Sequence, residues 1–225
     1  VAVVDKDFLK TAVSRAESDP KLGIVQSRVM LEQDKTRLNS IGNALHYLGF
    51  SFSIDNGEVF NTGMTPSLPV FCASGAGVLI KILLIQKIGL FAPEYFLYHE
   101  DVDLSWRARL AGYEIAVAED SVIYHHYEFS RSITKMYLME RNRLLTNFIN
   151  YEVATQLVIA PMFLVMELGT FIFAIKSGWW KEKLKAWAFF LRPSTWSFIS
   201  KRRSLVSEFR VVRDEALFPL FCTVV

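Results

Sequence analysis

The segment 153–175 constrains this chain most, because it is long and almost entirely apolar. Seventeen of its 23 residues are apolar and only Glu167 is charged, while Pro161 and Gly169 are positions where a helix could kink. At a rise of about 1.5 Å per residue, such a helix is about long enough to cross the core of a bilayer. Glu167 and Pro161 also suit a buried helical hairpin, so the sequence leaves both interpretations open.

The residues after this segment resemble those found at a membrane boundary. Trp179-Trp180 is followed by three lysines between positions 181 and 185, and tryptophans collect at the headgroup level of bilayers. The stretch 184–203 mixes aromatic and basic side chains, which is typical of a helix lying in the interface. The mean hydropathy of the chain is +0.24, which is high for a soluble enzyme.

Charge is distributed unevenly along the chain. The net charge is only +2, yet between Lys176 and Arg213 ten Lys or Arg accompany two Glu, a local net charge of +8. Each such cation is worth about 1 kcal/mol beside anionic lipid. We therefore expect residues 151–225 to form an apolar and basic helical region that contacts membrane lipid through residues 153–213. We expect no nucleic acid as a partner.

Residues 1–150 show strand signals alternating with helix signals, which favours an α/β fold. Residues 32–69 are rich in Asn, Gly, Ser, Asp and Thr, and we expect a long, partly ordered insertion there, of the kind that can serve as a substrate lid. The expected helices span 8–17 with Asp7 as N-cap, 82–88 ending at Gly89, 101–111 ending at Gly112, and 131–150; the expected strands span 22–29, 71–81, 113–118 and 122–124.

The cysteines and the N-terminus add two expectations. Cys72 and Cys222 match no metal-ligand spacing and make no disulfide framework, which indicates a reducing setting. The run Val1–Asp5 has no basic region and no long apolar core, so it is not a signal peptide. It reads as a strand entered in mid-course, and we expect the chain to be part of a longer protein.

The densest group of chemically active residues is the run from Phe96 to Arg107. It contains three carboxylates, Glu100, Asp101 and Asp103, at the expected start of a helix. A helix N-terminus stabilises anions, so these carboxylates can stay ionised and act as a general base or a metal ligand. The structural alternatives are an N-cap role for Asp101 and a solvated ion pair between Asp103 and Arg107.

Several segments together resemble the acceptor half of family-2 glycosyltransferases, and most closely their rhamnosyltransferase-like branch. The stretch from Glu100 to Tyr113 is the most specific part of the resemblance, which covers most of residues 1–150. The segments are Val3–Leu9, Gly42–Phe52, Ala73–Lys81, Ile88–Phe91, Tyr95–Tyr113, Asp120–His126 and Arg141–Arg143.

The resemblance implies a GT-A fold and an inverting sugar transfer. In such enzymes the residue matching Asp101, beside Glu100, deprotonates the acceptor hydroxyl, which attacks the anomeric carbon of a nucleotide-sugar. A divalent metal, Mg²⁺ or Mn²⁺, neutralises the diphosphate that leaves. The acceptor would be a glycan or a lipid-linked sugar, used at the cytoplasmic face of the cell membrane. The donor half precedes the segment matching Val3, so we do not expect this chain alone to bind donor.

Other residues of the resembling segments are candidates for binding. Ser74, Gly75 and Ala76 are expected to bind substrate, because glycines in this run would let the backbone approach a sugar ring closely. Trp106 and Arg107 are also expected to contribute to substrate binding. Arg141 could reach a diphosphate, while Arg143 has a solvated helix face as its alternative. His125 is expected near the metal, although it and His126 could equally pack beneath the sheet. We expect His46 and His99 to be surface or packing residues.

Two other functions compete with the glycosyltransferase. One is a catalytically inactive, membrane-bound scaffold or binding module with the same fold. The other is a metal-dependent hydrolase built on Glu100, Asp101 and Asp103. The hydrolase would need further ligands outside residues 100–126, and the sequence offers no convincing set.

Overall fold

The computed structural model describes residues 2–126 and 133–223 of the chain. A mixed sheet with the strand order β1-β7-β2-β3 forms the centre of an α/β body, and β6 pairs with β2 beside this path. The strands are β1 (Ala2–Val4), β2 (Leu22–Leu31), β3 (Leu38–Ser40), β6 (Val78–Ile80) and β7 (Glu114–His125). Only β2 and β7 run parallel among these pairs. The mixed α/β class expected from the sequence is therefore present.

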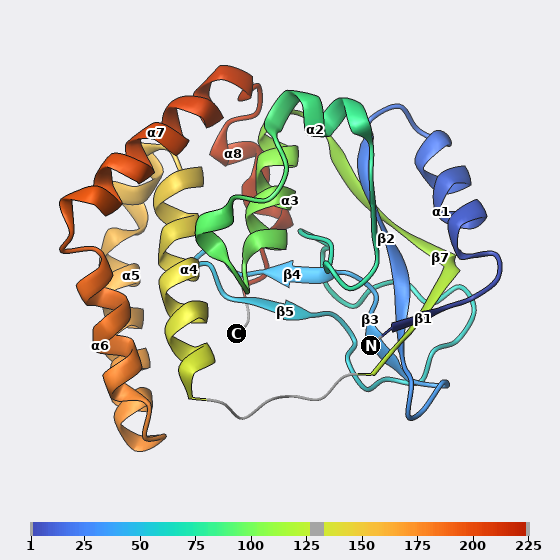
Figure 1. Ribbon diagram of the computed structural model, residues 1–225, viewed down its shortest axis with the longest axis horizontal. Coiled ribbons are helices and arrows are strands. Elements are labelled where there is room, and N and C mark those ends of the chain that lie inside the picture. Colours follow the sequence, from blue (N-terminus) through green and yellow to red (C-terminus); the bar gives the residue numbers. More distant parts are fainter. Residues whose placement is uncertain (1, 127–132, 224–225) are drawn as a thin grey trace.

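Helices cover both faces of this sheet (Figure 1). Successive side chains of a strand point to opposite faces, and Ile24 and Val25 of β2 accordingly join two different apolar clusters. The cluster of Val25 includes Ala16 of α1 (Phe8–Glu17). The cluster of Ile24 includes residues of α2 (Ile82–Ile88) and α3 (Glu100–Leu110). Because β2 is covered on both sides, it is buried along nearly its whole length.

The helices expected at 82–88 and 101–111 are confirmed. Gly89 ends α2 with φ +72°, and Gly112 follows α3 with φ +87°; both conformations favour glycine. Asp7 occupies the N-cap position of α1 but makes no capping bond with its side chain. The expected helix at 131–150 is present as α4 (Thr134–Asn150), and residues 131–132 lie outside the described part.

The expectation of two short strands at 113–118 and 122–124 is wrong, because both belong to β7. The pairing of β7 with β2 passes from Ser27–Ala118 directly to Arg28–Val122. Residues 119–121 therefore form a bulge, in which extra residues on one strand oppose none on its partner. The expected strand at 71–81 is reduced to β6, with an isolated bridge between Asn43 and Cys72 ahead of it.

Residues 32–69, where we expected a long, partly ordered insertion, are packed into the body. They contain β3 and a two-stranded sheet of β4 (Asn43–Leu45) and β5 (Ser51–Ser53). Fully buried apolar residues of this segment, among them Leu38 and Ile41, form a core cluster with Met30 of β2. The apolar residues stand singly among Asn and Gly, so no periodic pattern marks them. The segment is part of the core and not a lid.

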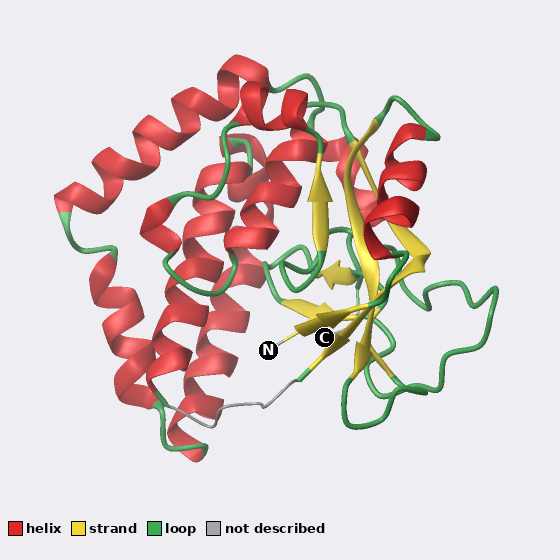
Figure 2. Ribbon diagram, turned by 45° about the vertical axis from the view of Figure 1, so that its right-hand side comes forward, coloured by secondary structure: helices red, strands yellow, loops and turns green. Residues whose placement is uncertain are grey.

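A helical flank follows the body. It comprises α5 (Val153–Lys176), α6 (Trp180–Phe189), α7 (Pro193–Phe209), the short α8 (Asp214–Leu217) and a final 3-10 turn at Phe218–Leu220. In both views α4, α5 and α6 lie side by side, and α7 crosses their upper end (Figures 1 and 2). The expected interface helix at 184–203 is instead two helices, because Pro193 starts α7 after a break at 190–192.

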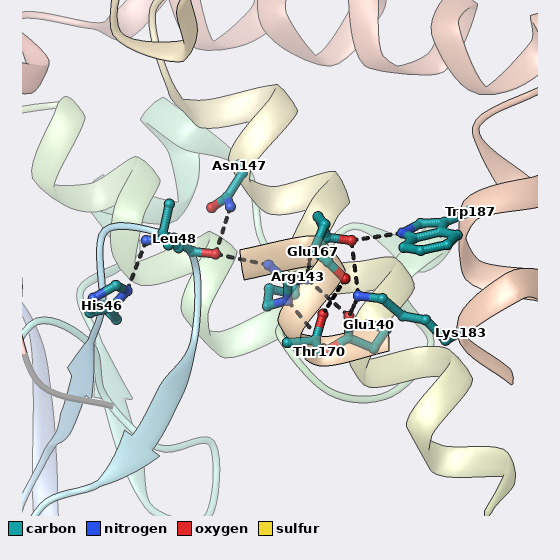
Figure 3. Close-up of polar contacts among 9 residues, drawn as sticks. All are labelled: His46, Leu48, Glu140, Arg143, Asn147, Glu167, Thr170, Lys183 and Trp187. Atoms are coloured by element: carbon teal, nitrogen blue, oxygen red, sulfur yellow. Dashed lines mark hydrogen bonds and ion pairs between the residues drawn. The ribbon is translucent and has the colours of Figure 1, made fainter. Parts of the chain in front are cut away.

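Helix α5 is long and apolar enough to span a membrane by length and composition alone, and only 17% of its most apolar window is buried. Its one carboxylate faces the protein: Glu167 pairs with Arg143 of α4 and with Lys183 of α6. Glu140 of α4 completes this buried charge cluster, and Trp187 Nε1 donates to Glu167 at 2.7 Å (Figure 3). One side of α5 is therefore tied to the body, while the other carries exposed apolar side chains.

Candidate active site

Asp101 is held by two backbone amides at the start of α3. Its Oδ2 accepts a hydrogen bond from the Gly75 N–H at 3.1 Å, and its Oδ1 accepts one from the Val102 N–H at 2.8 Å. Burial raises the pKa of Asp101 above its ordinary value, although these amide bonds work in the opposite direction. The result is an oriented carboxylate with a greater proton affinity than an ordinary aspartate.

Asp101 lines a pocket of about 190 Å³ that lies between α3, α4 and the small β4–β5 sheet. Its walls combine aromatic surface from Phe52 and Tyr98 with polar groups from Asn43, Ser51 and Ser53. Apolar walls with a few polar groups are typical of small-molecule sites. The sequence analysis did not find the β4–β5 residues, because their segment gave no strand pattern.

The loop before α3 is strained. Phe96, Tyr98 and His99 have φ values of +60°, +68° and +65°, which cost free energy in residues other than glycine and cluster at functional sites. The amide of Asn142 on α4 holds this loop, since its Nδ2 donates to the carbonyls of Tyr95, Leu97 and Tyr98 at 2.8–2.9 Å. Helix α4 thereby positions the residues that lead into Asp101.

Arg141 belongs to the same clamp. Its Nη2 donates to the carbonyls of Glu94 and Tyr95, and its Nε donates to the Asn142 side chain. Because its guanidinium group makes these three bonds, Arg141 holds the loop in place. Arg143 is buried in the charge cluster of the flank, so the expected solvated helix face is wrong for this residue.

Two polar groups beside Asp101 have no partner. Glu100 Oε2 and His99 Nδ1 are both buried and without a hydrogen bond among the described residues, and both side chains line the pocket. Burial, followed by the charge of Asp101, raises the pKa of Glu100. Burial, followed by the nearby Arg143, lowers the pKa of His99 to about 4. His99 is thus a neutral pocket residue rather than a surface residue, and its place directly before the paired carboxylates was the available signal.

The loop at Ser74, Gly75 and Ala76, expected to bind substrate, contacts Asp101 through the Gly75 N–H. The Ser74 N–H donates to Gln26 Oε1 at 2.6 Å, and the Ala73 N–H donates to Ser105 Oγ at 3.1 Å. These bonds tie the loop to β2 and α3, so the Gly75 N–H is directed at the carboxylate.

Trp106 and Arg107 do not reach the pocket. Both are fully buried. Trp106 packs edge-on against Phe71 and Tyr151. Arg107 pairs with the equally buried Asp103 at 2.8 Å and donates to the carbonyls of Ile88 and Leu90. The expected substrate contacts of these two residues are therefore replaced by structural ones, and the Asp103–Arg107 pair is not solvated.

His125 lies at the end of β7, where its Nδ1 is 3.2 Å from Asn39 Oδ1. Burial lowers its pKa, which keeps the imidazole neutral and able to ligate a metal. His126 is half-exposed and contacts Glu32 at 3.0 Å, so it does not pack beneath the sheet. Within residues 2–126 and 133–223, no three His, Cys, Asp or Glu side chains gather to hold a metal ion. The described residues thus do not form a complete divalent-cation site.

The architecture and the pocket define a mixed α/β domain with an oriented carboxylate at a helix start. The family described as glycosyltransferase-like family 2 matches residues 2–147, which include every pocket residue discussed above. This match covers well over half of the chain, and the protein belongs to that family. At the level of class it is a glycosyltransferase, for which a nucleotide-sugar donor and an acceptor are the general partners. No curated protein matches the sequence.

Proposed function

We propose that this protein is an inverting glycosyltransferase of the GT-A type, in the rhamnosyltransferase-like branch of its family. It transfers a hexosyl or rhamnosyl unit from a nucleotide-sugar to a hydroxyl of a glycan or lipid-linked acceptor in cell-surface polysaccharide or glycoconjugate synthesis. The observation that carries the proposal is the Asp101 carboxylate, held by the Gly75 amide at the edge of a sugar-sized pocket.

The proposed reaction uses Asp101 first as an ionised carboxylate and then as the protonated acid. Its ionised carboxylate accepts the proton of the acceptor hydroxyl while that oxygen bonds to the anomeric carbon of the donor. The bond from this carbon to the nucleoside diphosphate breaks on the opposite face, which inverts the configuration. Burial raises the pKa of Asp101, so the carboxylate binds the proton more readily than an exposed aspartate would. Its two backbone bonds keep the accepting oxygen in place during the transfer.

The family's use of Mg²⁺ or Mn²⁺ enters this proposal only through the resemblance. His125 is the one described residue that the resemblance places near such a metal, and with Asn39 it does not make a full ligand set. No step above depends on a metal.

Membrane attachment at the cytoplasmic face completes the proposal. The outer side of α5 exposes Leu157, Val158 and Leu164 by 64–79%, and residues 176–213, from its last residue onward, carry the local charge of +8. Because Glu167 holds the inner side of α5 against α4 and α6, we propose that α5 lies along the body with one face in lipid. If α5 crossed the bilayer apart from the body, Glu167 would be separated from Arg143 and Lys183.

The test is Asp101→Asn, with Glu58→Gln as a control that removes one exposed carboxylate elsewhere. Sugar transfer from a panel of nucleotide-sugars to membrane acceptors is measured with the full-length enzyme. Asparagine can still accept the Gly75 N–H but cannot take a proton, so turnover should fall by about 10²-fold or more, whereas the control stays near wild type. Turnover within threefold of wild type would remove Asp101 from this role. Unchanged absence of transfer in all variants would favour the inactive scaffold instead.

A further inference from the structure

The turn that joins β4 to β5, residues 46–50, is held by side chains of α4. Arg143 Nη1 and Asn147 Nδ2 both donate to the Leu48 carbonyl at 3.0 Å (Figure 3). The hydroxyl of Tyr151, directly after the helix, donates to the Tyr47 carbonyl at 2.7 Å. The three side chains follow one another at intervals of four residues, so they share one face of the helix. This face of α4 is therefore bonded to two consecutive carbonyls of the turn.

The turn approaches α4 so closely that a side chain at Gly49 would not fit. Gly49 has a φ of +90°, and a Cβ at this position would lie 2.7 Å from Asn147 Oδ1 and 3.0 Å from Arg143 Cγ. The guanidinium group of Arg143 also lies over the ring of Phe50, with Cζ 4.3 Å from the ring centroid. The turn is thus packed against α4 as well as bonded to it.

The strands that this turn joins form one wall of the Asp101 pocket. Asn43 of β4 and three consecutive residues of β5, Ser51, Phe52 and Ser53, line it. Among the described residues, the β4–β5 sheet has two strands of three residues each. A two-stranded sheet is only marginally stable by itself, so its position depends on contacts with the rest of the body. The bonds from α4 fix the turn directly before β5 begins.

Arg143 is itself oriented by the buried charge cluster of the flank. Its Nη2 pairs with Glu140 of α4 and Glu167 of α5, while its Nη1 is directed at the turn. A guanidinium group is planar with its donors in a fixed fork, so bonds to one nitrogen orient the other. Lys183 pairs with the same two carboxylates, and in the described part of the chain its hydrogen bonds and ion pairs do not reach the turn.

We infer that Arg143 and Asn147 are positioning residues for acceptor binding. They hold the β4–β5 turn against α4 and thereby set where Ser51 and Ser53 lie relative to Asp101. Neither residue lines the pocket, so both act through the wall and not on the reacting atoms. The inference rests on the proposed function of the pocket and extends it to the residues behind the wall. It predicts an effect on acceptor binding rather than on the chemical step.

Hydrogen exchange of the full chain in detergent, followed by mass spectrometry, tests the hold on the turn. The readout is the exchange rate of residues 46–53 divided by that of residues 100–110, because a general loss of stability speeds both. Asn147→Ala removes a donor to Leu48 and should raise this ratio by about tenfold or more. Gln156→Ala is the control, since this amide also donates to main-chain carbonyls, but outside the turn, and the ratio should change by less than about twofold. An unchanged ratio in Asn147→Ala would overturn the inference.

Arg143 offers a second pair of variants. Arg143→Met and Lys183→Met each remove one cation from the same buried cluster, but only the first removes a bond to the turn. Arg143→Met alone should therefore raise the exchange ratio by about tenfold or more. Equal ratios in the two variants would show that Arg143 acts through stability and would overturn its positioning role. If Arg143→Met does not fold, the Asn147→Ala result decides the question.

Sugar transfer shows whether the turn serves the pocket. With the membrane acceptors used for Asp101→Asn, the apparent KM for the acceptor should rise by about fivefold or more in Asn147→Ala, while kcat and the KM for the nucleotide-sugar stay within about twofold. Asp101→Asn lowers kcat instead. An unchanged acceptor KM beside a raised exchange ratio would overturn the link between the turn and the pocket. If the wild type transfers no sugar, the proposed function fails together with the acceptor role, whereas the exchange ratios still decide whether α4 holds the turn.

Discussion

The body and the long helix of the flank differ in where their large apolar side chains lie. In the body, residues such as Leu38 and Trp106 are fully buried. In the flank, Leu157 and Val158 of α5 are 71% and 79% exposed, while Lys183 of α6 is completely buried. Soluble proteins rarely expose large contiguous apolar patches, and buried charges need partners. The difference is the one expected from our proposal, in which water surrounds the body and lipid covers the outer side of α5.

The largest expected effect comes from breaking the buried charge cluster of the flank. Lys183→Met leaves Glu140 and Glu167 with Arg143 alone, and removing one partner of a buried ion pair costs about 3–5 kcal/mol. Urea unfolding in detergent measures the change. Lys185→Met is the control, since its pair with Glu182 is 64% exposed on the lysine side and should be worth less than about 1 kcal/mol. Adding Glu167→Gln to Lys183→Met should recover part of the loss, because it removes the excess negative charge.

The sequence predicted elements well where a local signal suffices. The ends of α2 and α3 follow from Gly89 and Gly112, and Asp101 at the start of α3 follows from its motif. The buried pair of Asp103 and Arg107 could not be predicted, because its burial depends on the carbonyls of Ile88 and Leu90, at and just after the end of α2. The β4–β5 sheet and its pocket residues Ser51 and Ser53 were missed for a related reason, since their burial is a product of tertiary packing.

A second expected effect is a pH dependence set by His99. Its pKa is lowered to about 4 in the folded protein, against about 6.5 in the unfolded chain. Between pH 6.5 and 4 the unfolded state therefore binds more protons, so stability falls as the pH is lowered through this window. The full shift corresponds to at most about 3 kcal/mol. His99→Gln should flatten the dependence of the free energy of unfolding on pH between 6.5 and 4; an unchanged slope would show that another group is responsible.

Gly77 in the body and Gly169 in α5 allow tight and open packing to be compared directly. A Cβ on Gly77 would lie 2.0 Å from Ile123 Cδ1, whereas a Cβ on Gly169 of α5 would meet nothing within 4 Å. Gly77→Ala should destabilise the body by about 1–3 kcal/mol through overpacking. Gly169→Ala should stabilise the protein by up to about 1 kcal/mol, because alanine favours the helix. Thermal unfolding of both variants measures the two effects, and equal signs would contradict the packing described for these sites.

The smallest effect on stability is expected on the outer side of α5. Val158→Asn changes an exposed position, so unfolding in detergent should shift by less than about 0.5 kcal/mol. Flotation with anionic liposomes should nevertheless drop severalfold, because a polar amide replaces an apolar contact with lipid. Lys10→Gln on α1, away from the flank, is the control for flotation. A variant that floats like wild type would indicate that water, rather than lipid, covers this face.

If α5 lies in lipid as we propose, helix α4 would hold Asp101 at a fixed distance from the bilayer. Its Asn142 grips the loop that leads into Asp101, and one residue further its Arg143 anchors α5. Consecutive residues of α4 thus hold the loop before Asp101 and the helix whose outer face we propose to lie in lipid. Under that proposal, the distance of an acceptor hydroxyl from the bilayer would contribute to its selection, together with its shape, and transfer would depend on the length of the glycan.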